Sequence, residues 1–245
     1  MRRIACLALA LIAASATPCA AQAVIAYETV TTVEEEVVML DPGSERFVAS
    51  HAVEVPHGIA QFGPFRVLDG SHAALVDVTD ERSPAAFARM LAAWPGLTTL
   101  EMIECPGTED DKANLRLGRM IHARGMATHV PAGGSVRSGA VELFLAGGRR
   151  IADRGAEFAV HAWADNEGRE ATDYAADAPE NQAYLTYYRE MGMTAIEARA
   201  FYDMTNSVPN ARAKWMNAAQ MALWVRLDDP APGGSGSLDS ARVVR

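Results

Sequence analysis

A serine and a histidine have the types and positions that nucleophilic catalysis requires. Ser138 lies in "SVRSGAVELFLAGG" (residues 135–148), and His161 lies in "EFAVHAW" (residues 157–163). A serine hydroxyl is a weak nucleophile at neutral pH and needs a base within hydrogen-bond reach. Histidine, whose unperturbed pKa is about 6.5, can take up that proton and return it. The pair is therefore suited to attack on a carbonyl carbon.

Backbone groups near Ser138 could stabilise the oxyanion that such an attack creates. Ser138 opens a predicted helix, so the N–H groups that follow it and the positive end of the helix dipole point toward it. The N–H of Gly139 can then donate to an oxyanion. Upstream, the turn "CPGT" (residues 105–108) follows a predicted strand.

Each of these residues also has an ordinary structural interpretation. Serine is among the best N-cap residues, so Ser138 in front of "GAVELF" fits a purely capping role. A histidine at the end of a strand is commonly a satisfied structural group, and Pro-Gly after a strand is usually only a turn. The catalytic hypothesis therefore rests on the motifs taken together.

The elements that must position these residues alternate between strand and helix. Ser83 is the expected N-cap of a helix with Pro84 at its first position, and Gly125 ends a second helix. This alternation predicts an α/β domain with a largely parallel sheet and right-handed crossovers. The expected strands are residues 65–68, 73–79, 98–104, 126–134 and 157–161, and the expected helices are 83–94, 109–125 and 138–148.

The sequence after His161 is polar as far as residue 182 and predicts a loop. Two helices are expected over residues 183–205, split near Gly192, with Thr194 as an N-cap. Residues 215–227 are expected to hold a last helix and a closing strand.

The N-terminus is typical of a cleavable secretory signal peptide. It combines Arg2 and Arg3, an apolar run, and a small-x-small pattern at Ala21-Gln22-Ala23. Acylation at Cys19, as in a lipoprotein, fits less well, because Pro18 stands where lipoprotein cleavage sites have a small residue. We expect a periplasmic or secreted protein with no stable membrane insertion after cleavage. The expected divisions are the signal peptide (1–23), a β-rich extension (24–62), the α/β domain (63–227) and a disordered tail (228–245).

Composition excludes several classes of function. The net charge of the 245 residues is −9, and loss of Arg2 and Arg3 with the signal changes it to −11. Such a chain is a poor candidate for binding nucleic acid or anionic lipid. After cleavage Cys105 is the one cysteine left of three, so no internal disulfide can form. His122 and His129 have no cysteine or carboxylate at ligand spacing, so neither a metal nor a cofactor is expected.

The order of these motifs resembles the Clp protease proteolytic subunit (ClpP) and its secreted relatives. In that family a strand runs into "S-P-G-G", and here "CPGT" stands at that place. A later strand of the family runs into "A-S-M-G-A-x-L-L-A-A-G", which "RSGAVELFLAGG" (residues 137–148) matches without a gap. A further strand carries "M-I-H-Q", where this sequence has His161. The resemblance covers residues 65–161 well and 183–227 loosely.

The resemblance implies a ClpP/crotonase-like spiral of ββα units and a serine peptidase site. It gives Ser138 the role of nucleophile and His161 that of base, with the N–H groups of Gly139 and Thr108 as the oxyanion hole. It also implies an aspartate that orients the histidine. The family places this aspartate shortly before a helix start to which "WMNA" (residues 215–218) corresponds. Asp203 is the only carboxylate in the preceding "FYDMTNSVPNARAK" (residues 201–214) and is our candidate, while Asn206 and Asn210 are alternatives that carry no charge.

Two charged residues depart from the pattern of the family. Arg137 precedes the nucleophile position, and Glu142 follows one turn later, at a spacing that allows an ion pair. If either charge lines the site, a plain apolar peptide is a poor substrate. The family's ATP-driven partner and barrel assembly are not expected outside the cytoplasm, although a homo-oligomer stays open.

Three hypotheses follow from the sequence. The first is a secreted or periplasmic ClpP-like serine hydrolase that cleaves peptide bonds in a peptide or protein substrate. The second is a catalytically inactive binding or assembly protein that keeps the fold. The departures from the family at Arg137 and Thr108, and the lack of an aligned orienting acid, favour it. The third is a crotonase-type enzyme acting on a thioester, which shares the fold but not the serine and histidine pair.

Overall fold

The computed structural model describes residue 49 and residues 51–229, which all belong to one compact unit. The predicted signal peptide, most of the expected N-terminal extension and nearly all of the expected tail lie outside the described residues. Among the described residues, no helix combines the length and the apolar character that crossing a membrane requires.

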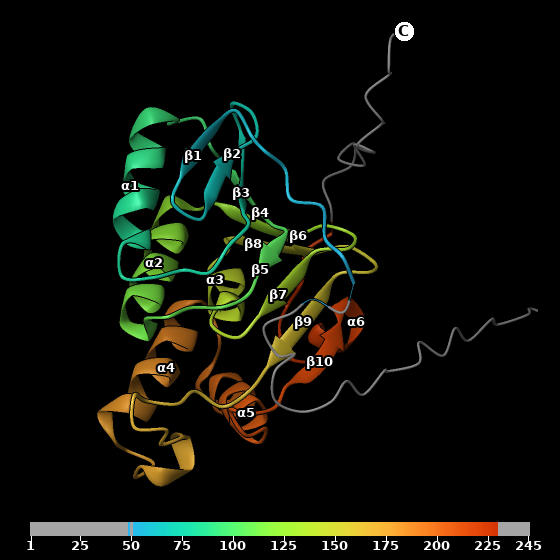
Figure 1. Cartoon of the computed structure of the whole chain (residues 1–245). Coiled ribbons are helices and arrows are strands. Elements are labelled where there is room, and N and C mark those ends of the chain that lie inside the picture. Colours follow the sequence, from blue (N-terminus) through green and yellow to red (C-terminus); the bar gives the residue numbers. More distant parts are fainter. Residues whose placement is uncertain (1–48, 50, 230–245) are drawn as a thin grey trace, which may run out of the picture. The chain divides into compact units, whose positions relative to one another are not determined.

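Successive ββα units build the centre of the molecule (Figure 1). The first strand of each unit joins a six-stranded sheet and the second joins a four-stranded sheet. This is the spiral of ββα units that the sequence predicts. The units comprise β4 (Thr99–Met102), β5 (Glu104–Cys105) and α2 (Asp111–Arg124), then β6 (Ala127–Val130), β7 (Ser135–Arg137) and α3 (Ala140–Leu145), then β8 (Arg149–Ala152) and β9 (Glu157–Val160).

Both sheets are parallel where they carry the ββα units and antiparallel at one end. The larger sheet has the order β1-β2-β3-β4-β6-β8, in which the pairs from β3 to β8 are parallel. The smaller has the order β10-β9-β7-β5, with β10 antiparallel to β9 and the other pairs parallel. The remaining strands are β1 (Ala60–Phe62), β2 (Phe65–Val67), β3 (His72–Leu75) and β10 (Lys214–Asn217).

Helices pack beside these strands and enclose the core. In Figure 1, α1 (Ser83–Ala93) and α2 lie on one side of the larger sheet, and α4 (Pro179–Glu190) and α5 (Ala195–Asn206) lie at the lower end. The short elements η2 (Ala171–Asp173) and α6 (Ala218–Met221) complete the described chain. Fully buried aromatic and aliphatic side chains from several elements form one continuous core, including Phe65, Phe87, Leu100, Phe144 and Phe158.

Capping signals locate the predicted helix ends well. The side chain of Asp110 accepts from Ala113 N–H at the start of α2, and Gly125 ends the helix in the left-handed conformation at φ 67°. Thr194 forms a capping box with Glu197 at the start of α5, as its position predicts.

Several predicted boundaries differ from the structure. Ser83 is the first residue of α1 rather than its N-cap, because Arg82 takes that position. The strand expected over residues 73–79 ends at Leu75, and Thr79 makes only an isolated bridge to Thr108. The last strand, β10, precedes the last helix, α6, rather than closing the chain after it. β7 and β8 were not predicted as separate strands.

Candidate active site

Ser138 occupies a sharp turn between β7 and α3. Its φ is 51°, and among the described residues it is the one non-glycine residue with a positive φ. Such backbone is costly for a residue with a Cβ and is concentrated at functional sites. The N-cap of α3 is Gly139, with no side-chain cap bond, so the Ser138 hydroxyl does not cap the helix. This finding removes the capping interpretation.

The turn of residues 105–108 packs directly against Ser138. A Cβ added to Gly107 would lie 2.8 Å from Ser138 Cβ and 3.2 Å from its Oγ, and the φ of Gly107 is 133°. Both the contact and the backbone conformation therefore require glycine here. In the sequence this residue stands out only as part of a turn.

Two buried polar residues fix this turn relative to the start of α3. Thr79 N–H donates to Gly107 O at 3.0 Å, and Thr79 Oγ1 donates to Asn114 Oδ1 at 3.1 Å. Asn114 Nδ2 in turn donates to Gly139 O at 2.6 Å. Thr79 is 1% exposed and Asn114 is 2% exposed, so these bonds are shielded from water. Neither residue belongs to a sequence motif that points to the site.

The two candidate oxyanion donors lie beside the serine. Thr108 and Gly139 line the same cavity as Ser138, and a Cβ on Gly139 would meet Thr108 Cγ2 at 2.4 Å. Within the described part of the chain, neither N–H group donates a hydrogen bond. Both therefore keep the capacity to bind an oxygen atom in the cavity.

His161 follows the last residue of β9 and lines the cavity with Ser138. The register of the parallel pair β7 and β9 brings their ends together, and Ser138 N–H donates to Ala159 O at 2.9 Å. Among the contacts of the described residues there is no direct hydrogen bond between the Ser138 hydroxyl and the imidazole. Catalytic hydrogen bonds are often long before substrate binds.

A main-chain carbonyl orients the imidazole. His161 Nδ1 lies 2.9 Å from Ala162 O, and Asn210 Nδ2 donates to the same oxygen at 2.8 Å. Asn210 Nδ2 also lies 3.3 Å from His161 Nδ1. A proton on Nδ1 lets the ring donate to the carbonyl and leaves Nε2 as the basic nitrogen. Asn210, one of the three residues considered for the orienting role, is thus the neighbour of the histidine.

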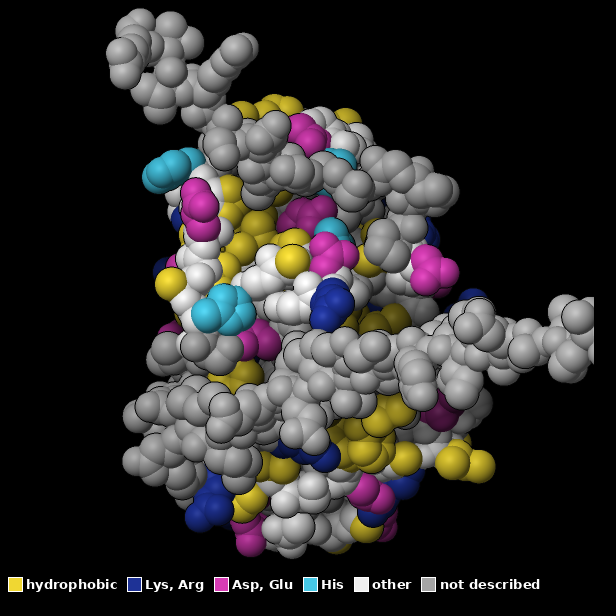
Figure 2. Space-filling model, turned by 90° about the vertical axis from the view of Figure 1, so that its right-hand side faces the viewer, with side chains coloured by type: hydrophobic (Ala, Val, Ile, Leu, Met, Phe, Trp, Pro, Cys, Tyr) yellow, Lys and Arg dark blue, Asp and Glu magenta, His cyan; other side chains and the backbone are white. Residues whose placement is uncertain are grey.

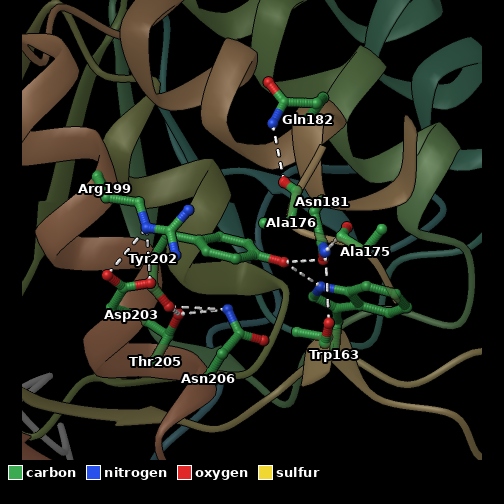
Figure 3. Close-up of polar contacts among 11 residues, drawn as sticks. Trp163, Ala175, Ala176, Asn181, Gln182, Arg199, Tyr202, Asp203, Thr205 and Asn206 are labelled. Carbon is green, nitrogen blue, oxygen red and sulfur yellow. Dashed lines mark hydrogen bonds and ion pairs between the residues drawn. The ribbon is translucent and has the colours of Figure 1, made fainter. Parts of the chain in front are cut away.

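Asp203 does not reach the site, which corrects the prediction made from the sequence. Its carboxylate pairs with Arg199 at 2.9 Å on the surface of α5, where the Asp203 side chain is 54% exposed. Figure 3 shows Asp203 and Arg199 turned toward each other, while Tyr202 points the other way, toward Asn181 and Trp163. Asn206 lines the cavity, but its Nδ2 donates to Tyr202 O at 2.8 Å rather than to the histidine.

Arg137 and Glu142 do not form the ion pair that their spacing allows. Arg137 is fully buried and pairs with Glu104 across β5 and β7. Its guanidinium also donates to Ser135 Oγ, and this hydroxyl donates to Glu157 Oε1. The arginine therefore holds together the two strands that carry Gly107 and Ser138 and does not line the cavity.

Glu142 and Asp111 are the carboxyl groups most affected by burial. Glu142 is 8% exposed, and its Oε1 accepts from Tyr188 Oη at 2.8 Å. Burial raises the pKa of Glu142 to about 7, with a smaller contribution from the charge of Asp111. Burial likewise raises the pKa of Asp111, and the Tyr184 hydroxyl partly opposes this shift.

The cavity has a volume of about 710 Å³, and the residues that line it fall into two groups by their chemistry. Ser138, His161 and the backbone donors form one group. The other combines acidic and aromatic side chains, with Trp163 stacked on Tyr184 at 6.1 Å between ring centroids. Its charged side chains include six carboxyl groups and one lysine, namely Glu109, Asp110, Asp111, Glu142, Asp165, Glu180 and Lys112.

Cys105 is not a second nucleophile. The thiol is fully buried, and burial raises its pKa well above the usual range, so the reactive thiolate is disfavoured. Among the described residues, no group of three or more His, Cys, Asp and Glu side chains is arranged to hold a metal ion.

Comparison with known proteins gives structural neighbours only. No family model and no curated protein matches the sequence. A mutant of the membrane-bound stomatin-specific protease 1510-N, in complex with a substrate peptide, aligns at a TM-score of 0.40 and 14% identity, over 62% of this chain and 73% of that one. A second mutant of that protease aligns at a TM-score of 0.41 and 13% identity, over 64% of this chain and 76% of that one. A mutant of ClpP1 from Listeria monocytogenes aligns at a TM-score of 0.44 and 14% identity, over 66% of this chain and 91% of that one.

The succession of ββα units, with one strand of each unit in either sheet, makes this an α/β fold with largely parallel sheets, as the sequence predicts. At TM-scores of 0.40–0.44 and 13–14% identity, these likenesses assign no activity to this chain. The chemistry of the cavity therefore has to follow from its own residues.

Proposed function

We propose that the protein is a serine hydrolase that cleaves peptide bonds. Ser138 is the nucleophile and His161 is the general base. The Ala162 carbonyl, held by Asn210, orients the imidazole. The N–H groups of Gly139 and Thr108 form the oxyanion hole.

The reaction is an acyl transfer in two halves. Ser138 Oγ attacks the carbonyl carbon while Nε2 of His161 takes the hydroxyl proton, and the carbonyl oxygen becomes an oxyanion at the two N–H groups. The C–N bond then breaks, the amine leaves with the proton from His161, and an acyl-serine ester remains. Water, deprotonated by His161, hydrolyses this ester and restores the serine.

The conformation of Ser138 is the observation that carries this proposal. A serine that only caps a helix has no need of a positive φ, and Ser138 does not cap α3. At 51° the backbone instead presents the hydroxyl at a strand-to-helix turn that lines a cavity, next to two N–H groups. Strain of this kind is also a feature of nucleophile turns in other hydrolase folds.

Covalent labelling tests the proposal directly. A fluorophosphonate probe should label the wild-type protein, and Ser138→Ala should lose the label while keeping its far-UV circular dichroism and melting temperature. Labelling that persists in Ser138→Ala would place the reactive group elsewhere. His161→Ala should slow labelling by at least about 10², since a positioned base contributes 10²–10⁴.

The second candidate function is an inactive binding protein with the same fold. Two observations favour it: the serine and histidine share no direct hydrogen bond, and Asn210 stands where a carboxylate would stabilise the imidazolium. The same experiment decides between the two, because an inactive protein takes no label.

We also propose that the protein works in the periplasm or outside the cell. Residues 1–23 support this through their charged start, apolar run and cleavage pattern. Cell fractionation and N-terminal sequencing of the mature protein test it, and the expected first residue is Val24. Recovery of the uncleaved chain from the cytoplasm would contradict the proposal.

A further inference from the structure

The acidic part of the cavity contains a buried carboxyl group with no countercharge. Glutamate is rarely buried unless it is paired, because transfer of its charge out of water is costly. Glu142 is 8% exposed, and its partner on Oε1 is the neutral hydroxyl of Tyr188. In the described part of the chain, neither Glu142 nor Asp111 forms an ion pair with Lys, Arg or His.

The position of Glu142 relates this carboxyl group to the proposed nucleophile. Both residues line the cavity, and Glu142 follows Ser138 by four residues, in α3 just beyond the turn of Ser138 and Gly139. Asp111 lies at the start of α2, which packs against α3, and its charge acts on Glu142. A substrate bound at Ser138 therefore has the two carboxyl groups within the same cavity.

Aromatic rings complete the walls around these carboxyl groups. Tyr184 stacks on Trp163, and Tyr184 and Tyr188 have centroids 6.4 Å apart. Aromatic faces attract organic cations and also bury their alkyl stems. A metal ion does not suit this lining, since among the described residues no three side chains of metal-binding type converge.

The acidity belongs to the cavity in particular. On the face shown in Figure 2, acidic and basic side chains lie among one another over the described surface. The cavity lining instead has six carboxyl groups against one lysine. Walls of one charge concentrate ligands of the opposite charge.

We propose that this cavity binds a long basic side chain of the substrate, that of lysine or arginine, with Glu142 and Asp111 facing the positive charge. The inference rests on the proposed function, because it places the basic residue next to the bond that Ser138 attacks. The alkyl stem packs along the tyrosine and tryptophan rings while the charged end supplies the missing countercharge.

The test compares fluorogenic peptide amides that differ only in the residue before the cleaved bond: lysine, arginine, norleucine, glutamine and glutamate. The expected kcat/KM of the wild-type protein is at least about tenfold higher for lysine or arginine than for norleucine, since each 1.4 kcal/mol of discrimination is tenfold. Glu142→Gln should bring the ratio of lysine to norleucine close to one, and Asp111→Asn should lower it. Equal cleavage of all five peptides by the wild-type protein would overturn the inference.

Controls separate the specificity from the reaction and from folding. Glu190→Gln makes the same carboxyl-to-amide change on the exposed Arg119 pair of α4 and should leave the ratio unchanged. Fluorophosphonate labelling of each variant reports the nucleophile independently of any peptide. If the wild-type protein is labelled normally but cleaves basic and other peptides equally, the inference is refuted while the proposed function stands.

A binding measurement covers the case in which the protein is not an enzyme. Ser138→Ala should bind a fluorescent lysine peptide more tightly than its norleucine analogue, and Glu142→Gln in that background should remove the difference in fluorescence anisotropy. No turnover and no labelling, together with this difference, would refute the proposed function but support the pocket. Equal binding of the two peptides would refute the pocket.

Discussion

At the scale of the residue, a main-chain carbonyl contacts the imidazole of His161 within the described part of the chain. The Ala162 carbonyl accepts from both the imidazole and Asn210, so it can fix the tautomer of the ring. It carries no full negative charge, and so it stabilises the imidazolium less than an aspartate does. We therefore expect Asn210 to act as a positioning residue, through the carbonyl that it holds.

Substitution of Asn210 tests this role against that of Asp203. Asn210→Ala should lower the rate of fluorophosphonate labelling by roughly 10², since a misplacement of about 1 Å can cost that much. Asp203→Asn should stay within about twofold, because it removes only an exposed pair, of a kind worth about 0–1 kcal/mol. The readout is the second-order labelling rate, with melting temperature as the control for folding.

The opposite order of effects would restore Asp203 to the site. Asn210→Gln keeps the amide but lengthens the side chain, so its labelling rate should fall between those of Asn210→Ala and Asp203→Asn. A merely structural Asn210 would change the melting temperature without changing the labelling rate of the folded fraction.

Gly107 provides a second test at the same scale. Gly107→Ala places a Cβ 2.8 Å from Ser138 Cβ at a φ of 133°, so the turn has to move away from the serine. Displacement of one oxyanion donor costs about 10²–10³ in rate. We expect a loss of that order in labelling, whereas Gly125→Ala, at the exposed end of α2, should affect stability only. An unchanged labelling rate in Gly107→Ala would show that this turn plays no part in the reaction.

At the scale of the element, β5 and β7 are joined by a buried charge pair. Arg137 is fully buried, and Glu104 is its partner. Such a pair seldom adds much stability compared with apolar residues of the same volume, but breaking it leaves a buried charge. Its position suits alignment of the strands that lead into the turns of Gly107 and Ser138.

Removal of one partner should therefore cost more than removal of both. Glu104→Leu should lower the free energy of unfolding by about 3–5 kcal/mol, because it leaves the Arg137 charge buried. The double variant with Arg137→Met should recover most of that loss. Urea denaturation gives the three free energies, and equal losses in the single and double variants would contradict the interpretation.

The elements also show which parts of the structure were predictable from sequence. The end of α2 and the start of α5 follow from the predicted caps at Gly125 and Thr194, because capping is a local interaction. β7 and β8 have only three and four residues, and their arginines interrupt the alternation of apolar and polar residues that identifies a strand. Only the fold shows that Arg137 is buried against a carboxylate from another unit.

The candidate site divides in the same way. One cavity is lined by Ser138, His161, Gly139 and Thr108. Their place in the site was predictable because each adjoins a strand or helix whose type the sequence indicates. Asp203 is the only carboxylate in the segment just before residue 215, which makes it the candidate from sequence. Its spacing of four residues from Arg199, however, already fits an ion pair on the surface of a helix. Asn210 follows α5 in a loop, and no periodic pattern specifies where such a loop packs.

At the scale of the whole molecule, the buried carboxyl group of Glu142 couples stability to pH. Its pKa is raised from the ordinary 4.5 to about 7, so the folded chain holds the proton more tightly than the unfolded chain does. The resulting stabilisation is complete below about pH 4.5 and is lost as the pH rises through about 7. The raised pKa of Asp111 acts in the same direction.

The loss of stability should amount to roughly 3 kcal/mol, since each pKa unit corresponds to about 1.4 kcal/mol. Glu142→Gln cannot ionise, so its advantage over the wild-type protein should grow by about that amount between pH 5 and pH 8. Urea denaturation of both proteins at the two pH values measures the difference, with Glu190→Gln as the matched control. A basic peptide should reduce the advantage at pH 8, because it supplies the countercharge that the folded chain lacks. An advantage of Glu142→Gln that does not change with pH would mean that folding leaves the pKa of this carboxyl group unshifted, so that its charge is already solvated or paired in the cavity. The proposed recognition of a basic side chain would then lose its physical basis.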